Sequence, residues 1–146
     1  MIIRPATVDD VETLFAIRCG VVENHQSRRE LAALGITPTT VAAMIVGGDY
    51  LTSLAEVDGD GVGFTMAQIS ESYLFACFVK PGFDGRGIGR ALMAAAEEGL
   101  RCTGVKRAWL TTGAEPHLRA LGFYRHLGWQ ALDTLENGEL KFEKTL

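Results

Sequence analysis

Three glycines that alternate along one short segment offer the first chemistry that this sequence suggests. Gly85, Gly87 and Gly89 lie between a continuously apolar segment, residues 73–79, and a helical pattern that begins at Ile88. Glycines at the start of a helix leave the backbone N–H groups of the first turn open, and the helix dipole adds positive potential there. The segment therefore suits a phosphate group or another anion.

Two arginines in the same loop strengthen this interpretation. Arg86 and Arg90 add positive charge, and a guanidinium can bind a diphosphate through several N–H donors at once. The loop lacks the GxxxxGK[ST] spacing of P-loop proteins, and its glycines do not follow the GxGxxG spacing of dinucleotide-binding folds. A nucleotide site is therefore disfavoured, and the remaining alternative is a glycine turn that only joins a strand to a helix.

The elements that must position this loop are predicted from periodicity and turn residues. Strands are expected over residues 1–4, 50–56, 62–69, 73–79, 105–112, 129–134 and 139–146. Helices are expected over residues 8–19, 39–46, 88–101 and 116–127. A further helical segment is expected after the polar residues 23–27 and through Leu34. In the helix over 88–101 the charged residues Arg90, Glu97, Glu98 and Arg101 fall largely off the apolar stripe.

This order of elements indicates the fold class. Residues 58–61 and 136–138 carry the Asp-Gly and Asn-Gly pairs typical of tight hairpins. Hairpins around one strand–helix–strand crossover predict an α+β fold, with a mixed, mostly antiparallel sheet and helices on both faces. The continuously apolar strand over 73–79 should be central, because a strand covered on both faces needs apolar residues on both.

Composition limits the classes of function. The chain has 146 residues, of which 47% are hydrophobic, so we expect a single domain over residues 1–146. Its net charge of −4 disfavours a nucleic-acid partner, and Gly35 and Pro38 interrupt the longest uncharged run, so no membrane span is expected. Nothing at residues 1–4 resembles a signal peptide, which favours a cytoplasmic location.

The cysteines predict neither a disulfide nor a metal site. Cys19, Cys77 and Cys102 are widely spaced and show no CxxC or Cys/His ligand pattern. We expect three reduced, mostly buried thiols. Cys77 is a poor candidate for a nucleophile, because an apolar strand without a paired histidine raises the pKa of a thiol.

Two motifs together resemble those of one enzyme family. Residues 79–92, Val-x-Pro followed by Gly-Arg-Gly-Ile-Gly-Arg-Ala-Leu, resemble the acetyl-CoA-binding motif of the GCN5-related N-acetyltransferases (GNAT family). Residues 119–129 are similar to the family's second motif, a helix that carries Phe-Tyr and is followed by Leu-Gly-aromatic. The order of predicted elements also resembles that of the family along nearly the whole chain. The resemblance implies a GNAT-like sheet with a central splayed strand pair and acetyl-CoA as co-substrate.

The resemblance also assigns residues to the cofactor. The backbone of residues 77–79 would pair with pantetheine, the Val79 N–H would stabilise an oxyanion, and Tyr124 would be the general acid. The implied cofactor-binding residues are Cys77, Phe78, Val79, Asp84, Gly85, Arg86, Gly87, Ile88, Gly89, Arg90, His117 and Tyr124.

Two of these positions depart from the family's pattern. Asp84 stands where Arg or Gln is usual, and we expect its side chain to face solvent or cap a backbone amide rather than meet phosphate. His117 stands where many members carry Asn, and an imidazole can still make one hydrogen bond to pantetheine. Binding of the diphosphate would then rely on the backbone and Arg86.

Acetyl transfer needs no covalent intermediate on the protein. The amine must lose a proton, the tetrahedral oxyanion needs donors, and the departing thiolate needs a proton. Glu23 and Glu71 are candidate general bases, with an exposed surface position as the alternative for each. If both lined the acceptor site, they would favour a cationic amine.

The predicted function is therefore an acetyl-CoA-dependent N-acetyltransferase. It would move the acetyl group to the primary amine of a small molecule or a peptide, by direct attack within a ternary complex. The alternative is a non-catalytic acyl-CoA-binding or interaction module on the same fold, for which the departures at Asp84 and His117 leave room. The terminal hairpin over residues 129–146 offers a sheet edge through which a homodimer could form.

Overall fold

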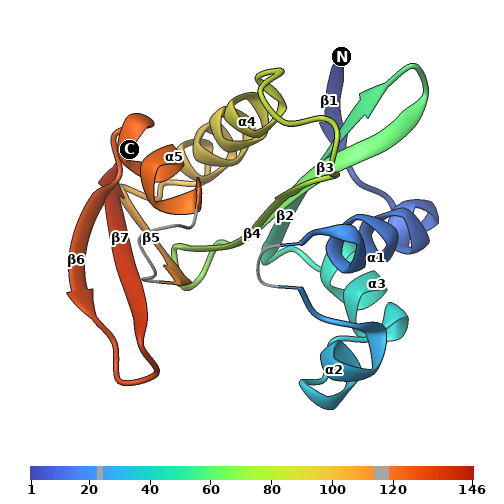
Figure 1. Cartoon of the computed structure of the whole chain (residues 1–146), viewed down its shortest axis with the longest axis horizontal. Helices are drawn as coiled ribbons and strands as arrows, with labels where there is room; N and C mark the ends of the chain where they lie inside the picture. Colours follow the sequence, from blue (N-terminus) through green and yellow to red (C-terminus); the bar gives the residue numbers. More distant parts are fainter. Residues whose placement is uncertain (23–24, 114–118) are drawn as a thin grey trace.

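The computed structural model describes residues 1–22, 25–113 and 119–146. Within these residues one seven-stranded sheet runs through the molecule in the order β1-β2-β3-β4-β5-β7-β6 (Figure 1). The strands are β1 (Ile2–Pro5), β2 (Tyr50–Val57), β3 (Asp60–Gln68), β4 (Tyr73–Val79), β5 (Arg107–Gly113), β6 (Gln130–Thr134) and β7 (Glu139–Thr145). Neighbours are antiparallel except β4 and β5, which are parallel. The predicted mixed, mostly antiparallel sheet is confirmed, with β4 at its centre.

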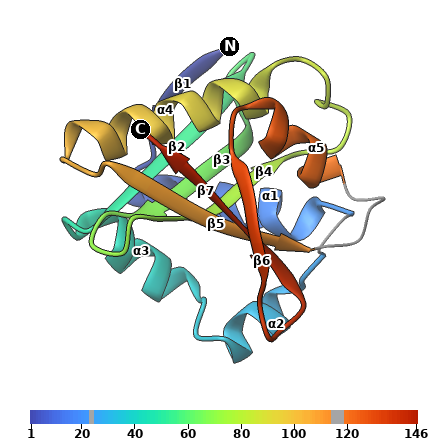
Figure 2. The same cartoon turned by 90° about the vertical axis from the view of Figure 1, so that its left-hand side faces the viewer.

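Helices cover both faces of the sheet (Figures 1 and 2). A short 3-10 helix, η1 (Val8–Asp10), precedes α1 (Val11–Gly20), α2 (Arg28–Ala33), α3 (Pro38–Val46), α4 (Ile88–Cys102) and α5 (Arg119–His126). The helices α1 and α3 pack on β2–β4 from one side, where α2 also lies, and α4 packs on the same strands from the other side. The two helical layers therefore enclose the apolar strands between them.

Local sequence explains where the helices of the first layer begin. Ser27 and Glu30 form a capping box, in which each side chain accepts a hydrogen bond from the other residue's backbone N–H, at 3.2 and 3.1 Å. Thr37 caps α3 in the same way, with Pro38 at the first helical position. These caps define where α2 and α3 begin.

Several boundaries differ from the predictions. The helix expected over 116–127 is seen as α5, and residues 114–118 lie outside the described residues. The strand expected from residue 105 begins at Arg107, because the Val105 N–H still donates to the Leu100 carbonyl at the end of α4. Glu97, predicted off the apolar stripe, is buried because Lys144 and Trp129 contact its carboxylate.

The cysteines correct one expectation. All three thiols are free, but Cys102 is exposed and Cys19 and Cys77 are only half-buried, so the prediction of mostly buried thiols was wrong. Cys102 lies in the last turn of α4, beyond its apolar contacts. Among the described residues, no helix is long and apolar enough to cross a membrane. The same part of the chain holds no cluster of His, Cys, Asp and Glu suited to a metal ion.

The sheet opens between β4 and β5. The two strands share the register pair Tyr73 and Trp109, whose rings stack with centroids 4.0 Å apart. The Trp109 indole N–H also donates to the Glu71 carbonyl at 2.9 Å. Beyond this point no further register pair joins β4 to β5 in the described residues. The central splayed strand pair is therefore present, closed at one end by aromatic stacking and open at the end where β4 leads into the glycine loop (Figure 1).

Candidate active site

The glycine loop adopts a backbone that side chains would strain. Gly82, Gly85 and Gly87 have φ of 89°, 75° and 79°, in the left-handed region that favours glycine. A Cβ atom built on any of the three meets nothing within 4 Å. The space above the loop is therefore open, as a ligand that lies against the backbone requires.

The loop ends at the start of α4, where donors point into that space. Gly87 is the N-cap, and its carbonyl accepts a hydrogen bond from the Ala91 N–H at 3.0 Å. The N–H groups of residues 88–90 precede the first intrahelical donor, so the helix supplies no acceptor for them. Together with the dipole of a 15-residue helix they form a potential anion site.

Gly89 has a different role from the other two glycines of the motif. A Cβ at this position would come 3.2 Å from the Phe123 ring. The absence of a side chain here therefore allows the Phe123 ring of α5 to lie against the first turn of α4. This packing brings the aromatic residues of α5 to the edge of the loop.

Basic side chains surround the mouth of the site. Arg90 donates to the His126 Nε2 atom at 3.0 Å, which links α4 to α5. Arg86 lies over the Phe83 ring, 4.9 Å from its centroid. Asp84 is exposed, as expected, and accepts an ion pair from Arg119 at 3.2 Å rather than capping a backbone amide. Both side chains line the cleft described below, and Arg119 offsets the negative charge of Asp84 there.

Between the loop, α4 and α5 lies a cleft of about 570 Å³, which we call the cofactor cleft. Its floor is the end of β4, where Cys77 and Val79 line it, and its far wall is α5 with Phe123 and Tyr124. Strand β4 is only half-buried here, which differs from the expectation of full cover on both faces. The difference arises because the strand lines a cleft instead of a closed core.

The exposed edge of β4 carries open backbone groups. Lys80 donates its N–H to the Val62 carbonyl at 2.8 Å, so even-numbered residues at this end of β4 bond to β3. Because hydrogen bonding alternates along an antiparallel strand, the N–H and C=O groups of Cys77 and Val79 turn the other way, toward the opening. An extended amide-containing group could pair with them as a strand would.

Tyr124 lies where the cofactor cleft meets the interior. Its ring packs against Phe123, Trp129 and Phe142, at centroid distances of 5.2, 6.4 and 5.9 Å. Burial, and to a lesser degree the neighbouring Cys77, raises the pKa of the Tyr124 hydroxyl well above its usual value. The hydroxyl is therefore protonated at neutral pH and can donate. Burial likewise raises the pKa of the Cys77 thiol to about 12, in agreement with the prediction that it is no nucleophile.

A second cleft, of about 610 Å³, opens on the other side of Tyr124 and is called here the acceptor cleft. Cys77, Ala120 and Tyr124 line both clefts, so the two meet at these residues. The other walls come from the end of α1, the segment before α2 with the first turn of that helix, strand β4, the end of β5, and the β6–β7 turn with the start of β7. They contribute Arg18, His25, Gln26, Glu30, Tyr73–Phe78, Thr111–Gly113 and Asn137–Glu139.

The two predicted bases have different positions. Glu23 lies outside the described residues, as does His117. Glu71 is exposed in the turn before β4 and lines neither cleft. Six residues separate it from Cys77, about 20 Å along an extended strand, so the structure does not bring its carboxylate to the meeting point.

Sequence reasoning missed most of the acceptor cleft. Arg18 and Gln26 are half-buried there, and the Arg18 Nη2 atom donates to the Gln26 Oε1 atom at 2.7 Å. Thr111 and Asn137 come from strands and turns far away in the sequence. No local pattern marks these residues, because each is ordinary in its own element.

Comparison with known proteins now decides the family. The sequence profile of the acetyltransferase (GNAT) family matches residues 11–129, which covers both clefts except for part of β7 and the β6–β7 turn. The chain belongs to this family. It is therefore an N-acetyltransferase with acetyl-CoA as its co-substrate, as the two sequence motifs predicted. No curated protein matches it by sequence.

Solved structures share the fold of this GNAT acetyltransferase over nearly its whole length. The PaiA N-acetyltransferase of Thermoplasma acidophilum, solved in complex with coenzyme A, has a TM-score of 0.86 at 20% identity, covering 99% of this chain and 98% of that one. A ribosomal-protein-alanine N-acetyltransferase from Brucella melitensis has a TM-score of 0.78 at 23% identity and covers 100% of both chains. The ribosomal-protein-S18-alanine N-acetyltransferase of Escherichia coli has a TM-score of 0.72 at 20% identity, with coverage of 97% and 90%. At these identities the likeness is one of fold.

Proposed function

We propose that this chain transfers the acetyl group of acetyl-CoA directly to the primary amine of a small molecule or a peptide, within a ternary complex. The observation that carries the proposal is the junction of the two clefts at Cys77 and Tyr124. One cleft suits a long anionic cofactor, and the other is open to a second substrate. Direct transfer needs such a junction, because donor and acceptor must meet in one place.

The cofactor cleft suits coenzyme A along its length. The diphosphate would bind the N–H groups of residues 85–90, with Arg86 and Arg90 adding charge. Pantetheine carries two amides, which would pair with the open backbone edge at Cys77 and Val79 as an added strand does. The complex of the Thermoplasma protein with coenzyme A supports this placement by likeness of fold.

Tyr124 is proposed as the general acid. When the tetrahedral intermediate collapses, the C–S bond breaks and the departing thiolate needs a proton. The Tyr124 hydroxyl can supply it, because its raised pKa keeps it protonated throughout the neutral range. The aromatic neighbours Phe123 and Phe142 hold the Tyr124 ring, and this packing fixes the position of the hydroxyl.

The Val79 N–H is proposed as the donor to the oxyanion. It turns toward the opening between β4 and β5, where the carbonyl of a thioester would lie if pantetheine follows the strand. A preorganised donor of this kind contributes about 3–4 kcal/mol to the transition state. The donor is a backbone group, so its position depends on the register of β4 rather than on a side chain.

The acceptor amine must lose a proton before or during attack. An amine with a pKa of about 10.4 is almost entirely protonated at pH 7, so its proton has to leave through a base or water. We propose a water in the acceptor cleft as the first recipient, with Glu23 as the predicted carboxylate near its path. After attack the amine gives up its second proton, and the products are an amide and free coenzyme A.

Thiol release tests the proposal. Acetyl-CoA is mixed with a library of primary amines and short peptides, and free thiol is measured together with acetylated product by mass spectrometry. We expect amine-dependent release of one thiol for each acetylated product. Binding of coenzyme A by calorimetry without any transfer would instead support the alternative, a non-catalytic acyl-CoA-binding module.

The terminal hairpin supports a second, separate part of the proposal. Strand β6 is exposed along its whole length, and Leu132 and Leu135 are 44% and 36% exposed. Such an edge can pair with another copy of itself, so we propose a homodimer in the cytoplasm. Light scattering of the wild type and of Leu132→Lys would test the dimer, because a charge on this edge opposes pairing.

A further inference from the structure

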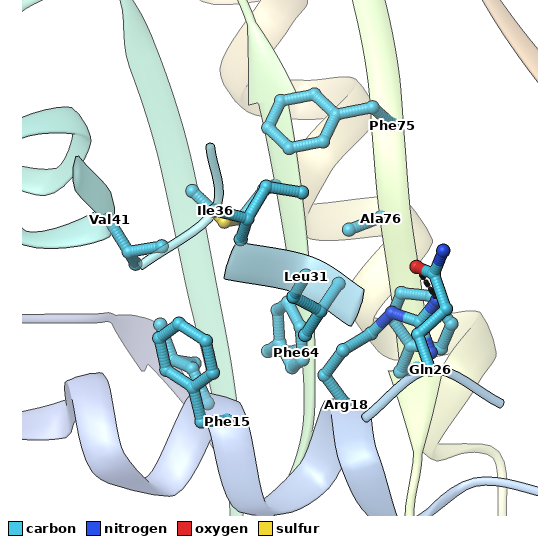
Figure 3. A pocket seen from close by; sticks show the side chains of 12 residues that line it. Phe15, Arg18, Gln26, Leu31, Ile36, Val41, Phe64, Phe75 and Ala76 are labelled. Carbon is cyan, nitrogen blue, oxygen red and sulfur yellow. Dashed lines mark hydrogen bonds between the residues drawn. The ribbon is translucent and has the colours of Figure 1, made fainter. Parts of the chain in front are cut away.

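An apolar pocket of about 190 Å³ lies between the first helical layer and the sheet (Figure 3). Its walls come from α1, from α2 and the segment after it, from α3, and from strands β3 and β4. The apolar lining residues are Leu14, Phe15, Leu31, Ile36, Val41, Phe64, Met66, Phe75, Ala76 and Phe78. Figure 3 shows the side chains of Phe15, Val41 and Phe75 directed toward the same space. The family motifs of this chain do not include this pocket.

A β-bulge in β4 explains why the pocket exists. Met66 pairs with Ala76 and the next residue, Ala67, pairs with Leu74, so Phe75 is an extra residue in the β4 ladder. Two consecutive residues, Phe75 and Ala76, therefore line the pocket, although side chains normally alternate between faces. Ala76 is small, and its short side chain leaves room beside the Phe75 ring.

The pocket borders the acceptor cleft. Five residues line both spaces, namely Arg18, Gln26, Phe75, Ala76 and Phe78. The acceptor cleft in turn meets the cofactor cleft at Cys77 and Tyr124. The pocket lies on the face of β4 that packs against α1 and α3, whereas Tyr124 packs with α4 on the other face. A group attached to an amine at this junction would therefore reach the pocket through the opening between β4 and β5.

Polar atoms are confined to the mouth of the pocket. Arg18 donates to Gln26 at 2.7 Å (Figure 3). The Arg18 guanidinium also lies 4.3 Å from the centroid of the Phe78 ring. Arg18 and Gln26 are the polar residues of a lining that is otherwise apolar. The pocket thus has an apolar interior and a rim that can hydrogen-bond a carbonyl or carboxylate oxygen.

The size of the pocket defines the group that fits. An apolar cavity of about 150 Å³ in a well-packed protein holds one benzene molecule. The pocket here is somewhat larger, at about 190 Å³. A phenyl ring or a branched alkyl group would fill it, whereas a linear charged chain would leave its charge without a partner among apolar side chains.

We propose that this pocket selects the acceptor, by taking an aryl or branched alkyl group carried by the amine. This inference rests on the proposed function, because it assumes that the amine is placed where the two clefts meet. The apolar group enters between α1, α3 and β4, and the amine points back toward Tyr124. Arg18 and Gln26 at the rim of the pocket would contact polar atoms of the acceptor that lie between its apolar group and its amine.

Equilibrium binding tests the pocket without catalysis. Coenzyme A, which has no acetyl group to transfer, is bound first, and then 2-phenylethylamine or ethylamine is titrated and followed by calorimetry. We expect phenylethylamine to bind at least tenfold more tightly than ethylamine. Equal affinities, or tighter binding of a linear diamine such as putrescine, would overturn the proposal.

Two variants on one helix localise the effect. Val41 is buried in α3 and lines the pocket, whereas Val46 on the same helix is 74% exposed. Val41→Phe fills the pocket and should reduce phenylethylamine binding at least tenfold, while ethylamine binding stays within twofold. Val46→Phe makes the same change outside the pocket and should alter neither. If Val41→Phe does not fold, Ile36→Phe fills the same space from the half-buried segment before α3. Unchanged phenylethylamine binding in whichever of these two variants folds would overturn the proposal.

Turnover with acetyl-CoA separates this inference from the proposed function. A preference for phenylethylamine in kcat/KM that is lost in Val41→Phe supports both. Tight, Val41-dependent binding of phenylethylamine with no acetylation supports the pocket and contradicts the proposed function. Acetylation without any preference for apolar amines supports the proposed function and contradicts the role of the pocket. The tripeptide Phe-Gly-Gly is compared with phenylethylamine, because an N-terminal phenylalanine carries the same group, and the higher kcat/KM identifies whether the acceptor is a peptide or a free amine.

Discussion

The cofactor cleft and the acceptor cleft are built from different kinds of groups. The cofactor cleft depends on backbone: three glycines with positive φ, a helix N-terminus and the open edge of β4. The acceptor cleft and its apolar pocket depend on side chains from five or more separate elements. A cofactor that never changes can be bound by main-chain groups, whereas an acceptor is selected by side chains that can vary without altering the fold.

Each side of the molecule also has an ion pair that fixes a helix to the sheet. On the cofactor side, Lys144 of β7 donates to the Glu97 carboxylate of α4 at 2.7 Å. On the acceptor side, Arg4 of β1 donates to both carboxylate oxygens of Asp10, just before α1, at 2.8 Å each. Glu97 is buried, whereas Arg4 is about one-third exposed. The burial of the first pair should make it the more costly to break.

The largest effect is expected from the backbone of the glycine loop. Gly87→Asp puts a negative side chain into the open space above the loop, where the diphosphate would bind, and should reduce coenzyme A affinity by at least 100-fold. The fold should be retained, because Asp tolerates a positive φ at a cost of about 1 kcal/mol. Calorimetry measures the affinity. Gly59→Asp is the matched control, since Gly59 has φ of 83° and open space but lies in the β2–β3 turn. Unchanged affinity in folded Gly87→Asp would contradict the assignment of the loop.

Removing the Tyr124 hydroxyl tests proton donation separately from cofactor binding. Tyr124→Phe should lower kcat by about 100-fold or more, because the leaving thiolate loses its proton donor, while coenzyme A affinity changes little. Steady-state kinetics and calorimetry measure the two quantities. Tyr50→Phe removes a hydroxyl from a half-buried tyrosine that lines neither cleft, and should leave both unchanged. Wild-type turnover in Tyr124→Phe would reduce Tyr124 to a packing role.

The buried ion pair should matter most for stability. Lys144→Met leaves the Glu97 carboxylate buried with, among the described residues, only the Trp129 indole N–H, at 3.3 Å, and should lower the free energy of unfolding by about 2–4 kcal/mol. Urea denaturation measures this quantity. Lys141→Met is the control on the same strand, where the ammonium lies over the Trp109 ring, and should cost less than about 1 kcal/mol. Equal losses in both variants would show that the buried carboxylate is not the cause.

The half-buried ion pair of Arg4 and Asp10 should give the smallest effect, and one that depends on pH. Arg4 lowers the pKa of Asp10 from 3.8 to about 2 by hydrogen bonding. Because the folded-state pKa is lowered, the stabilisation is complete above pH 3.8 and is lost as the pH falls to about 2. Asp10→Asn should therefore cost about 1 kcal/mol at pH 7 and almost nothing near pH 2. Urea denaturation at several pH values measures the difference, with Asp9→Asn in the same turn as control. A cost independent of pH would contradict the role of the charge.

The sequence predictions were correct for features that depend on neighbouring residues and failed for features that depend on residues far apart in the chain. The glycine loop, the Phe-Tyr helix and the central strand were predicted because each depends on neighbours in the chain. Glu97 was placed off the apolar stripe, yet it is buried, because its partner Lys144 lies 47 residues later and no helical pattern can show that. Glu71 was a candidate base by its position before β4, and only the direction of the strand shows that it lies at the opposite end from the loop.

The sequence by itself determined the family, the cofactor and the order of elements, because glycine spacing, capping residues and apolar periodicity are local properties of a chain. Only the tertiary structure decided where the acceptor cleft lies and what surrounds it. Arg18, Phe75 and Val41 become neighbours because a bulge in β4 and the packing of two helices bring them together. Their joint shape is a property of packed surfaces, which no one segment encodes alone.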